Sequence, residues 1–199
     1  MKRIVLASGN PGKIREIGAL LAPLAIEVVP QSRFAVSEAE EPYDTFLENA
    51  LAKARHASRA TGLPALADDS GLSVDALGGA PGVHSAYYAG REGDRATRDA
   101  RNNRKLLDSL GDERRAHYTC VIVFLENQEK KPLVAEGRWQ GEIARAPRGS
   151  NGFGYDPLFV VKDLGKTAAE LDAEQKNRIS HRGIALAKLL ELLRDPSRA

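Results

Sequence analysis

The chain has 199 residues, of which 42% are hydrophobic and 28% charged, and these proportions are typical of a globular protein with a sizeable buried core. Its formal net charge of +2 gives no support to a strongly basic nucleic-acid binder or to an acidic tail. Because we find no signal peptide and no apolar run long enough to cross a bilayer, we expect a cytoplasmic protein that binds neither membranes nor nucleic acids. The single cysteine, Cys120, lies in the apolar run 118–125, so we expect a buried thiol and no intramolecular disulfide.

The first predicted elements are a strand, a loop of small residues and a helix. Residues 2–7 form a compact apolar strand, and a helical pattern runs from 11 to about 21. The loop between them consists of Ser8, Gly9, Asn10, Pro11, Gly12 and Lys13. A helix N-terminus with free amides and a nearby lysine is typical of an anion site, although a purely structural turn explains the same residues. The loop is not a Walker A motif, because the spacing is too short and Ile14 stands where Ser or Thr is required.

The next predicted elements are a second strand and a capped helix. Residues 26–30 have strand character, and the polar loop 32–44 carries the acids Glu38, Glu40 and Glu41. Thr45 and Glu48 form a capping-box pattern that opens a helix, which we expect to end near 61 at a glycine and a proline.

Two adjacent acids then follow the apolar run 63–67. Asp68 and Asp69 come directly before Ser70 and Gly71, and this order predicts a buried strand that ends by delivering carboxylates to the sheet edge. Ligands of open α/β sheets bind outside the carboxyl ends of the strands. Paired carboxylates there suit Mg2+, which usually accompanies substrate phosphates. The alternative is a strand-to-turn junction in which Asp and Ser side chains cap local amides.

The second half of the chain favours a mixed sheet. A helix is expected over 95–110, and the charges of both signs in 91–115 favour a solvated helix face over a nucleic-acid patch. Segments 117–126 and 133–144 resemble an antiparallel pair. We therefore expect an α/β fold with a mixed central sheet flanked by helices, forming one elongated, two-lobed domain over 1–199 with a substrate cleft.

Two later segments carry functional residue types. In the loop 152–157, glycines flank aromatic residues, so the backbone can approach a planar ligand while a ring offers a stacking face. The alternative is a tight turn with Phe153 and Tyr155 packed inward. The last predicted helix bears the apolar stripe Ile179, Leu186, Leu189, Leu190 and Leu193, and Pro196 is expected to end it. With Ser180 as its N-cap, His181 and Arg182 fall in its first turn, where cations oppose the helix dipole. That local conflict is typical of a functional position.

Six motifs in this order closely resemble the inosine triphosphate pyrophosphatase family, whose bacterial members are dITP/XTP pyrophosphatases. They are the segments 8–13, 45–50, 67–72, 77–82, 152–157 and 176–182. Each motif alone is weakly specific, and the six together cover nearly the whole chain. The resemblance implies a homodimer that uses Mg2+ to cleave deaminated purine nucleoside triphosphates into the monophosphate and pyrophosphate.

The resemblance also implies a role for each matching residue. The loop 8–13 would hold the triphosphate with help from Lys53, Asp69 would be the catalytic carboxylate and a Mg2+ ligand with Glu41, and Ser70 would touch the substrate. Glu40 and Asp68 remain alternatives for the second acid. The residues that would cradle the base and sugar are Phe153, Gly154, Tyr155 and Asp156, and those that would read the base edge are Lys176, His181 and Arg182.

Two other functions are weighed against this one. A pyrophosphatase of the Maf-like type would act on pyrimidine or modified nucleotides, so turnover of dITP against dTTP separates the two. A nucleic-acid-binding module that uses the helix within 91–115 would instead bind DNA in a salt-sensitive manner without hydrolysing nucleotides.

Overall fold

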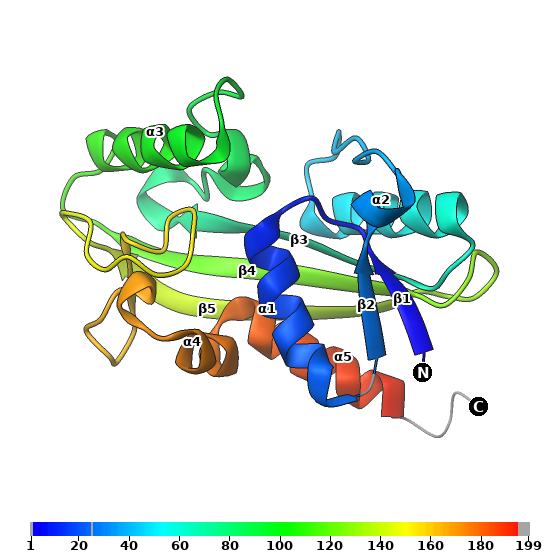
Figure 1. The fold of residues 1–199 in the computed structure, drawn as a ribbon. Helices are drawn as coiled ribbons and strands as arrows, with labels where there is room; N and C mark the ends of the chain where they lie inside the picture. The colour runs from blue at the N-terminus through cyan, green and yellow to red at the C-terminus, as the bar shows by residue number, and fades with distance from the viewer. Residues whose placement is uncertain (1, 25, 195–199) are drawn as a thin grey trace. The chain divides into compact units, whose positions relative to one another are not determined.

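The computed structural model describes residues 2–24 and 26–194, and within them the strands form one six-stranded sheet of order β2-β1-β3-β4-β5-β6 (Figure 1). The strands are β1 (Lys2–Leu6), β2 (Ile26–Pro30), β3 (Ala65–Val74), β4 (Arg115–Leu125), β5 (Leu133–Ile143) and β6 (Phe159–Val161). The α-helices are α1 (Pro11–Leu21), α2 (Phe46–Thr61), α3 (Arg95–Asp108), α4 (Ala173–Ile179) and α5 (His181–Arg194). Because β1 is parallel to β2 and β3 while β5 is antiparallel to β6, the predicted mixed sheet flanked by helices is confirmed.

The chain divides into two compact units. Unit 1 comprises Met1–Asp69, Cys120–Gly137 and His181–Ala199, and unit 2 comprises Ser70–Thr119 and Arg138–Ser180. The elongated shape and the substrate cleft expected from the sequence remain predictions.

Local sequence signals set the ends of the first two α-helices. The Asn10 side chain accepts hydrogen bonds from the amides of Gly12 and Lys13, and this cap starts α1 directly at Pro11. The Thr45 side chain accepts from the Glu48 amide at the start of α2, and Gly62 ends the helix in the left-handed conformation with φ of 69°. Both helices therefore begin and end where the sequence predicts.

The strand that carries the two acids is longer than predicted. We expected it to end at Asp68 and Asp69, but β3 continues through them to Val74. The parallel pairing of β1 with β3 stops at Leu6 opposite Leu66, while β4 neighbours β3 in the sheet. Because β4 still pairs with β3 after the β1 pairing has ended, β3 continues through the two acids and beyond the end of β1.

The C-terminal helical segment is also interrupted. We expected Ile179 on the stripe of the last helix, but it ends the separate helix α4, which also carries Lys176. Ser180 lies between the helices in an extended conformation with ψ of 161°, and α5 begins at His181. The prediction that His181 and Arg182 occupy the first turn of the last helix is confirmed. The expected stop at Pro196 lies outside the described residues.

Each unit has its own apolar core. In unit 1, two clusters centre on the strands, one containing Leu66 and Ile122 and the other Ala67 and Val123. In unit 2, the ring of Phe159 packs on Tyr118 and Trp139, with centroid separations of 4.7 and 5.1 Å. None of the described helices has the length and apolar character needed to span a bilayer.

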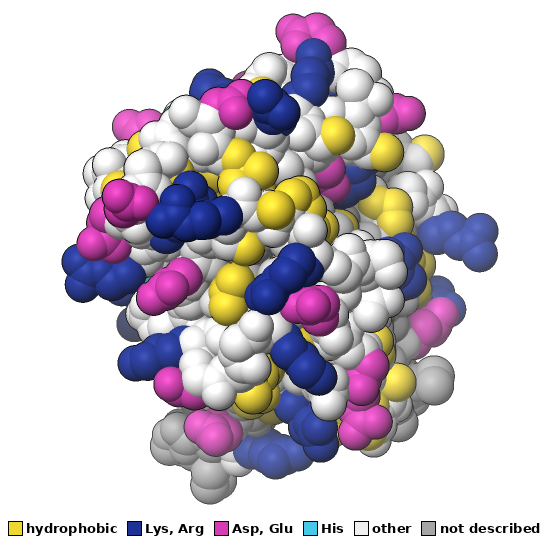
Figure 2. Space-filling view, turned by 90° about the vertical axis from the view of Figure 1, so that its left-hand side faces the viewer, with side chains coloured by type: hydrophobic (Ala, Val, Ile, Leu, Met, Phe, Trp, Pro, Cys, Tyr) yellow, Lys and Arg dark blue, Asp and Glu magenta, His cyan; other side chains and the backbone are white. Residues whose placement is uncertain are grey.

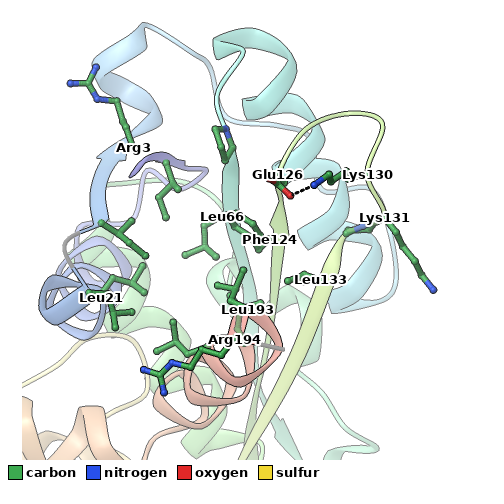
Figure 3. A pocket seen from close by; sticks show the side chains of 17 residues that line it. Arg3, Leu21, Leu66, Phe124, Glu126, Lys130, Lys131, Leu133, Leu193 and Arg194 are labelled. Carbon is green, nitrogen blue, oxygen red and sulfur yellow. Dashed lines mark hydrogen bonds and ion pairs between the residues drawn. The ribbon is translucent and has the colours of Figure 1, made fainter. Parts of the chain in front are cut away.

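Unit 1 also contains an apolar cavity of about 1140 Å³, which Figure 3 shows from close by. Its wall includes Leu21, Leu66, Phe124 and Leu133. At its rim, Lys130 forms an ion pair with Glu126 at 2.9 Å. None of the site residues predicted from the sequence lines this cavity.

Charges of both signs are intermixed on one face of the molecule and along α3. On the face drawn in Figure 2, Lys and Arg side chains alternate with Asp and Glu. On α3, Arg95 lies 3.7 Å from Asp99 and Arg104 lies 2.9 Å from Asp108. This pairing is what the mixed charges of 91–115 predict for a solvated helix face.

Candidate active site

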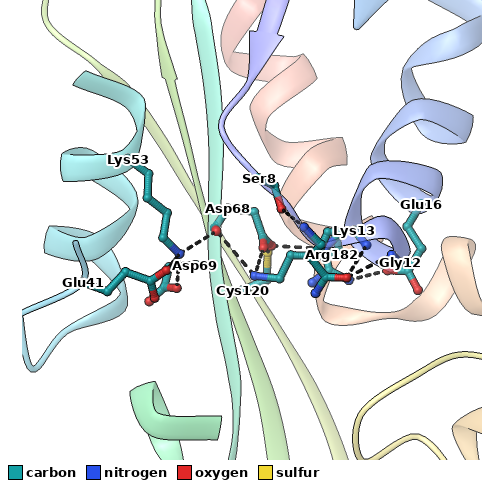
Figure 4. Close-up of polar contacts among 11 residues, drawn as sticks. Ser8, Gly12, Lys13, Glu16, Glu41, Lys53, Asp68, Asp69, Cys120 and Arg182 are labelled. Carbon is teal, nitrogen blue, oxygen red and sulfur yellow. Dashed lines mark hydrogen bonds and ion pairs between the residues drawn. The ribbon is translucent and has the colours of Figure 1, made fainter. Parts of the chain in front are cut away.

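The two adjacent acids of β3 belong to separate networks in unit 1. Successive side chains of a strand point to opposite faces of the sheet. The Asp69 carboxylate therefore faces Lys53 of α2, whereas the Asp68 carboxylate faces Lys13 of α1 and Arg182 of α5 (Figure 4).

Lys53 joins Asp69 to the acidic loop. Its Nζ lies 2.7 Å from Asp69 Oδ1 and 2.9 Å from Glu41 Oε1. The side chains of Lys53 and Asp69 are 11% and 6% exposed, whereas that of Glu41 is 40% exposed. Burial alone would lower the pKa of Lys53, but the charges of Asp69 and Glu41 outweigh it and raise the pKa. The structure thus brings together three of the residues predicted for the site.

Within residues 2–24 and 26–194, one carboxylate oxygen of Asp69 has no hydrogen-bond partner. Its Oδ2 is buried and accepts no hydrogen bond within the described part of the chain. Burial raises the pKa of Asp69, and the charges of Lys53 and Lys13 only partly offset this. A buried, incompletely compensated carboxylate is suited to hold a cation or to accept a proton.

The donor set fits a magnesium ion. Asp69 and Glu41 supply oxygen ligands, and Asp69 Oδ2 has no hydrogen-bond partner among the residues that the structure describes. No group of three His, Cys, Asp or Glu side chains placed to hold a metal occurs among the described residues. One or two carboxylates are nevertheless what Mg2+ usually takes from a protein, with substrate phosphates and water completing its shell.

Asp68 is the centre of the second network. Its Oδ1 forms an ion pair with Lys13, and its Oδ2 accepts from Arg182 Nε at 3.1 Å and from Cys120 Sγ at 2.8 Å. Burial would raise the pKa of Asp68, but the charges of Arg182 and Lys13 outweigh it and hold the pKa well below its usual range. Burial and the Asp68 charge together raise the pKa of the Cys120 thiol. Asp68 is therefore an ionised, fully buried anchor for its neighbours.

Arg182 is occupied by two carboxylates. Its side chain is 2% exposed, and besides Asp68 its Nη1 donates to Glu16 of α1. Burial would lower the pKa of Arg182, but the charges of Asp68 and Glu16 keep it raised. Arg182 thus links α5 to α1 and β3, and the base reading that the resemblance implies for it stays a prediction.

Two side chains of the loop 8–13 accept hydrogen bonds from backbone amides of the same loop. The Asn10 amide donates to Ser8 Oγ at 3.1 Å, and the amides of Gly12 and Lys13 donate to Asn10 Oδ1 at 2.9 and 3.3 Å. The expectation of free amides at this helix start is therefore wrong for these three residues, because the Ser8 and Asn10 side chains satisfy them locally. The Lys13 ammonium, paired with Asp68, is the cation that the loop contributes.

The loop 152–157 lies in unit 2 and is held by an ion pair. Asp156 Oδ2 accepts from the Phe153 amide at 2.8 Å and forms a buried ion pair with Lys176. Lys176 Nζ also lies 4.9 Å from the centroid of the Phe153 ring. Phe153 is half-buried, so of the two aromatic residues of this loop it is the one that is partly accessible to a planar ligand.

Tyr155 does not offer such a face. It is 3% exposed within the core of unit 2, and its hydroxyl donates to the Ser85 carbonyl at 2.9 Å. Burial raises its pKa. The inward-packed alternative therefore holds for the Tyr155 ring, and the implied contact of this residue with the base and sugar stays a prediction. Of the remaining predicted residues, Ser70 is half-buried in β3 beside Asp69, and His181 is buried at the start of α5.

Comparison with known proteins decides the family. The sequence profile of the Ham1 family matches residues 4–192. The chain belongs to the Ham1 family. It is 58% identical to a dITP/XTP pyrophosphatase of Ralstonia nicotianae over 98% of each chain, and 60% identical to one of Nitrosomonas europaea over 97% of this chain and 95% of that protein.

Solved structures agree with this assignment. A HAM1 protein from Coxiella burnetii matches with a TM-score of 0.87 at 50% identity, covering 100% of both chains. The Ham1 protein of Staphylococcus aureus matches with a TM-score of 0.83 at 42% identity, covering 96% of this chain and 98% of that one. The resemblance inferred from the six motifs is thereby confirmed at the level of the family.

Two members of the Asp68 network were not predicted as site residues. Glu16 follows Lys13 by three residues, so both lie on one face of α1, and this spacing was an available signal. Cys120 was expected only as a buried hydrophobe, and its polar role depends on β4 lying beside β3. No local sequence feature reports that pairing.

Proposed function

We propose that this Ham1 family chain hydrolyses deaminated purine nucleoside triphosphates, such as dITP and XTP, to the monophosphate and pyrophosphate. Relatives about 60% identical over nearly the whole chain carry the name dITP/XTP pyrophosphatase. In the site, the observation that carries the proposal is the unpartnered, buried Oδ2 of Asp69, which Lys53 holds in place through the other oxygen. A Maf-like activity is not favoured, because the Ham1 profile accounts for residues 4–192.

The residues of unit 1 have the chemistry for the phosphate end of the reaction. Cleavage of an α–β phosphoanhydride needs neutralisation of phosphate charge and an oriented water. Lys13 supplies positive charge from the loop 8–13, and Asp69 accepts the proton of the attacking water. We assign Mg2+ to Asp69 and Glu41, where it would add charge neutralisation and hold phosphate oxygens.

The residues of unit 2 have the chemistry for the base. Phe153 supplies a stacking face, and Lys176, fixed by Asp156, supplies a donor. Hypoxanthine and xanthine present an oxygen at position six where adenine presents an amino group. A site that donates a hydrogen bond to this oxygen rejects the mismatched donor of adenine strongly. The homodimer and the cytoplasmic location implied by the resemblance stay predictions.

A hydrolysis panel tests the function. Purified protein with Mg2+ is given dITP, XTP, ATP, GTP and dTTP, and pyrophosphate and orthophosphate are measured separately. We expect pyrophosphate from dITP and XTP far above the other substrates. Release of orthophosphate and a diphosphate, or faster turnover of dTTP, contradicts the proposal.

A second measurement tests the metal assignment without activity. Mg2+ is titrated into the wild type and into Asp69→Asn without nucleotide, and the thermal midpoint is followed. We expect Mg2+ to raise the midpoint of the wild type and not that of the variant. An equal rise in both proteins places the ion elsewhere.

A further inference from the structure

Two side chains of α3 hold the peptide groups of one residue in the loop 152–157. Asp99 Oδ2 accepts from the Gly154 amide at 2.9 Å, and Asn103 Nδ2 donates to the Gly154 carbonyl at 2.9 Å. Asp99 and Asn103 are four residues apart, so both lie on the same face of α3. All three residues belong to unit 2. Both polar groups of Gly154 are thus bound by one rigid element.

Gly154 is a position where such support matters. Its φ is +63°, in the left-handed region, and a Cβ added there would meet no atom within 4 Å. Neighbouring side chains therefore do not impose this conformation by crowding. Glycine samples many backbone conformations at similar free energy. The two hydrogen bonds from α3 therefore help to select this one, together with the turn bond that the Asp156 amide donates to the Phe153 carbonyl at 3.2 Å.

The same face of α3 reaches the aromatic ring beside Gly154. The Arg95 guanidinium lies 5.1 Å from the Phe153 ring centroid, and Arg95 Nε lies 3.7 Å from Asp99 Oδ2. One turn of α3 therefore contacts both the ring of Phe153 and the peptide that follows it. A shift of Asp99 would change the position of both.

Asn103 makes this contact at a cost in stability. Its other polar atom, Oδ1, is buried without a partner among the residues that the structure describes. A buried acceptor that lacks a hydrogen bond destabilises the folded state. Such a local conflict is typical of a residue kept for function.

We propose that Asp99 and Asn103 are positioning residues that set the conformation of the base-binding loop through Gly154 and thereby determine how well a purine base is recognised. Both residues would act through Gly154 and not by a contact of their own with the substrate. The proposal rests on the assignment of the loop 152–157 to the base under the proposed function. The arginine-rich helix α3 would then have a solvated face and a second face that supports the base-binding loop.

Matched variants on one helix test it. Asp99→Ala removes the acceptor, Asp99→Asn removes the charge but keeps an acceptor oxygen, and Asn103→Ala removes the donor. The control is Asp108→Ala, which likewise removes a carboxylate paired with an arginine four residues away, but at an exposed site without a loop contact. Steady-state kinetics with dITP are combined with hydrogen exchange of the segment that contains Gly154.

We expect Asp99→Ala to raise KM for dITP about tenfold with little change in kcat, as the loss of one hydrogen bond to a charged acceptor implies. Exchange at the Gly154 segment should become faster in Asp99→Ala and in Asn103→Ala. Asp99→Asn should restore both readouts toward the wild type, and Asp108→Ala should leave both unchanged. Because exchange needs no substrate, it reports on positioning even if the wild type fails to hydrolyse dITP, which would instead overturn the proposed function.

Several outcomes overturn the proposal. Equal KM and equal exchange in Asp99→Ala and Asp108→Ala mean that α3 does not position the loop. A fall in kcat and thermal midpoint with unchanged KM and exchange assigns Asp99 to overall stability. If Asp99→Ala does not fold, unchanged exchange and KM in Asn103→Ala contradict the proposal in the same way.

Discussion

Asp68 and Asp69 are neighbours in β3, yet the ion pairs of unit 1 compensate them very differently. On the Asp68 side, two cations, Lys13 and Arg182, meet two carboxylates, Asp68 and Glu16. On the Asp69 side, the single cation Lys53 meets two carboxylates, Asp69 and Glu41. Within the described residues, these ion pairs join two cations to two carboxylates in the first network and one cation to two carboxylates in the second.

This difference explains why the two acids have opposite pKa shifts. Both are buried in the same strand, so burial raises the pKa of each. Only Asp68 has enough positive charge around it to reverse that effect. A balanced network stabilises the positions of its members, whereas a network with excess negative charge and an unpartnered oxygen attracts a cation. The following predictions test this division of roles.

The largest expected effect is the loss of turnover in Asp69→Asn. The amide does not act as a base and binds Mg2+ poorly, so we expect dITP hydrolysis to fall by about a hundredfold to ten-thousandfold. The thermal midpoint should stay equal or rise, because the substitution removes an undercompensated charge. Pyrophosphate release and thermal unfolding measure the two effects. Near-normal turnover with an unchanged midpoint would move the catalytic role to Asp68 or to another residue.

Asp68→Asn should instead act mainly on stability. Loss of its charge leaves two buried cations with only Glu16 to compensate them, and removal of one partner of a buried ion pair typically costs about 3 kcal/mol or more. Chemical denaturation measures the free energy of unfolding. An unchanged stability would show that the Asp68 network is not a structural anchor.

The stabilising effect of Asp68 should depend on pH in a direction that follows from its lowered pKa. The folded-state pKa of Asp68 is depressed, so its stabilising contribution is fully present above the unfolded value of about 3.9 and is lost as the pH falls below it toward the folded value. The stability difference between the wild type and Asp68→Asn should therefore be constant from neutral pH to about pH 5 and shrink below pH 4.

Arg182→Lys separates positioning from base reading. Lysine keeps the charge but lacks the planar fork that reaches Asp68 and Glu16 together, so we expect about 2 kcal/mol lower stability. If Arg182 only positions its neighbours, the preference for ITP over ATP stays the same. The measurement is the ratio of kcat/KM for ITP to kcat/KM for ATP in the wild type and in Arg182→Lys. A tenfold or larger fall of this ratio in the variant would support the base-reading role that the resemblance implies.

The smallest effect is expected for Cys120→Ala. The thiol shares Asp68 Oδ2 with Arg182, and its loss should cost about 1 kcal/mol through one hydrogen bond and a small cavity. Ile122→Val is the matched control, since it removes one heavy atom from the same apolar cluster on the same strand. We expect a raised KM for dITP in Cys120→Ala, recovery in Cys120→Ser, and no change in Ile122→Val. Identical KM values in all three variants would assign Cys120 to packing alone.

Signals that act within a few residues were readable in the sequence. Pro11 after Asn10 predicts the start of α1, and Thr45 with Gly62 predicts both ends of α2, because caps bind amides and carbonyls of their own helix. The six motifs predicted the family, which the match over residues 4–192 confirms. The family resemblance implied that Asp69, Glu41 and Lys53 belong to one site, and the structure places them in contact.

Features that depend on distant partners were not readable. The order Asp-Asp-Ser-Gly suggested a strand end, but the neighbouring strand β4 allows β3 to continue to Val74. The occupation of Arg182 by Asp68 and Glu16 arises from segments more than a hundred residues apart. The support of Gly154 by Asp99 likewise joins residues that no periodicity relates. Sheet pairing and helix docking bring these groups together, and neither leaves a local pattern.

The internal hydrogen bonds of the loop 8–13 have a consequence for the kinetics of nucleotide binding. Since Ser8 and Asn10 already fix the amides of this loop, its shape exists before a ligand arrives. A binding site that is ordered in advance loses little conformational entropy on association, and its encounter rate is not limited by loop rearrangement. Under the proposed function, the start of α1 would therefore meet an incoming triphosphate without first rearranging its loop.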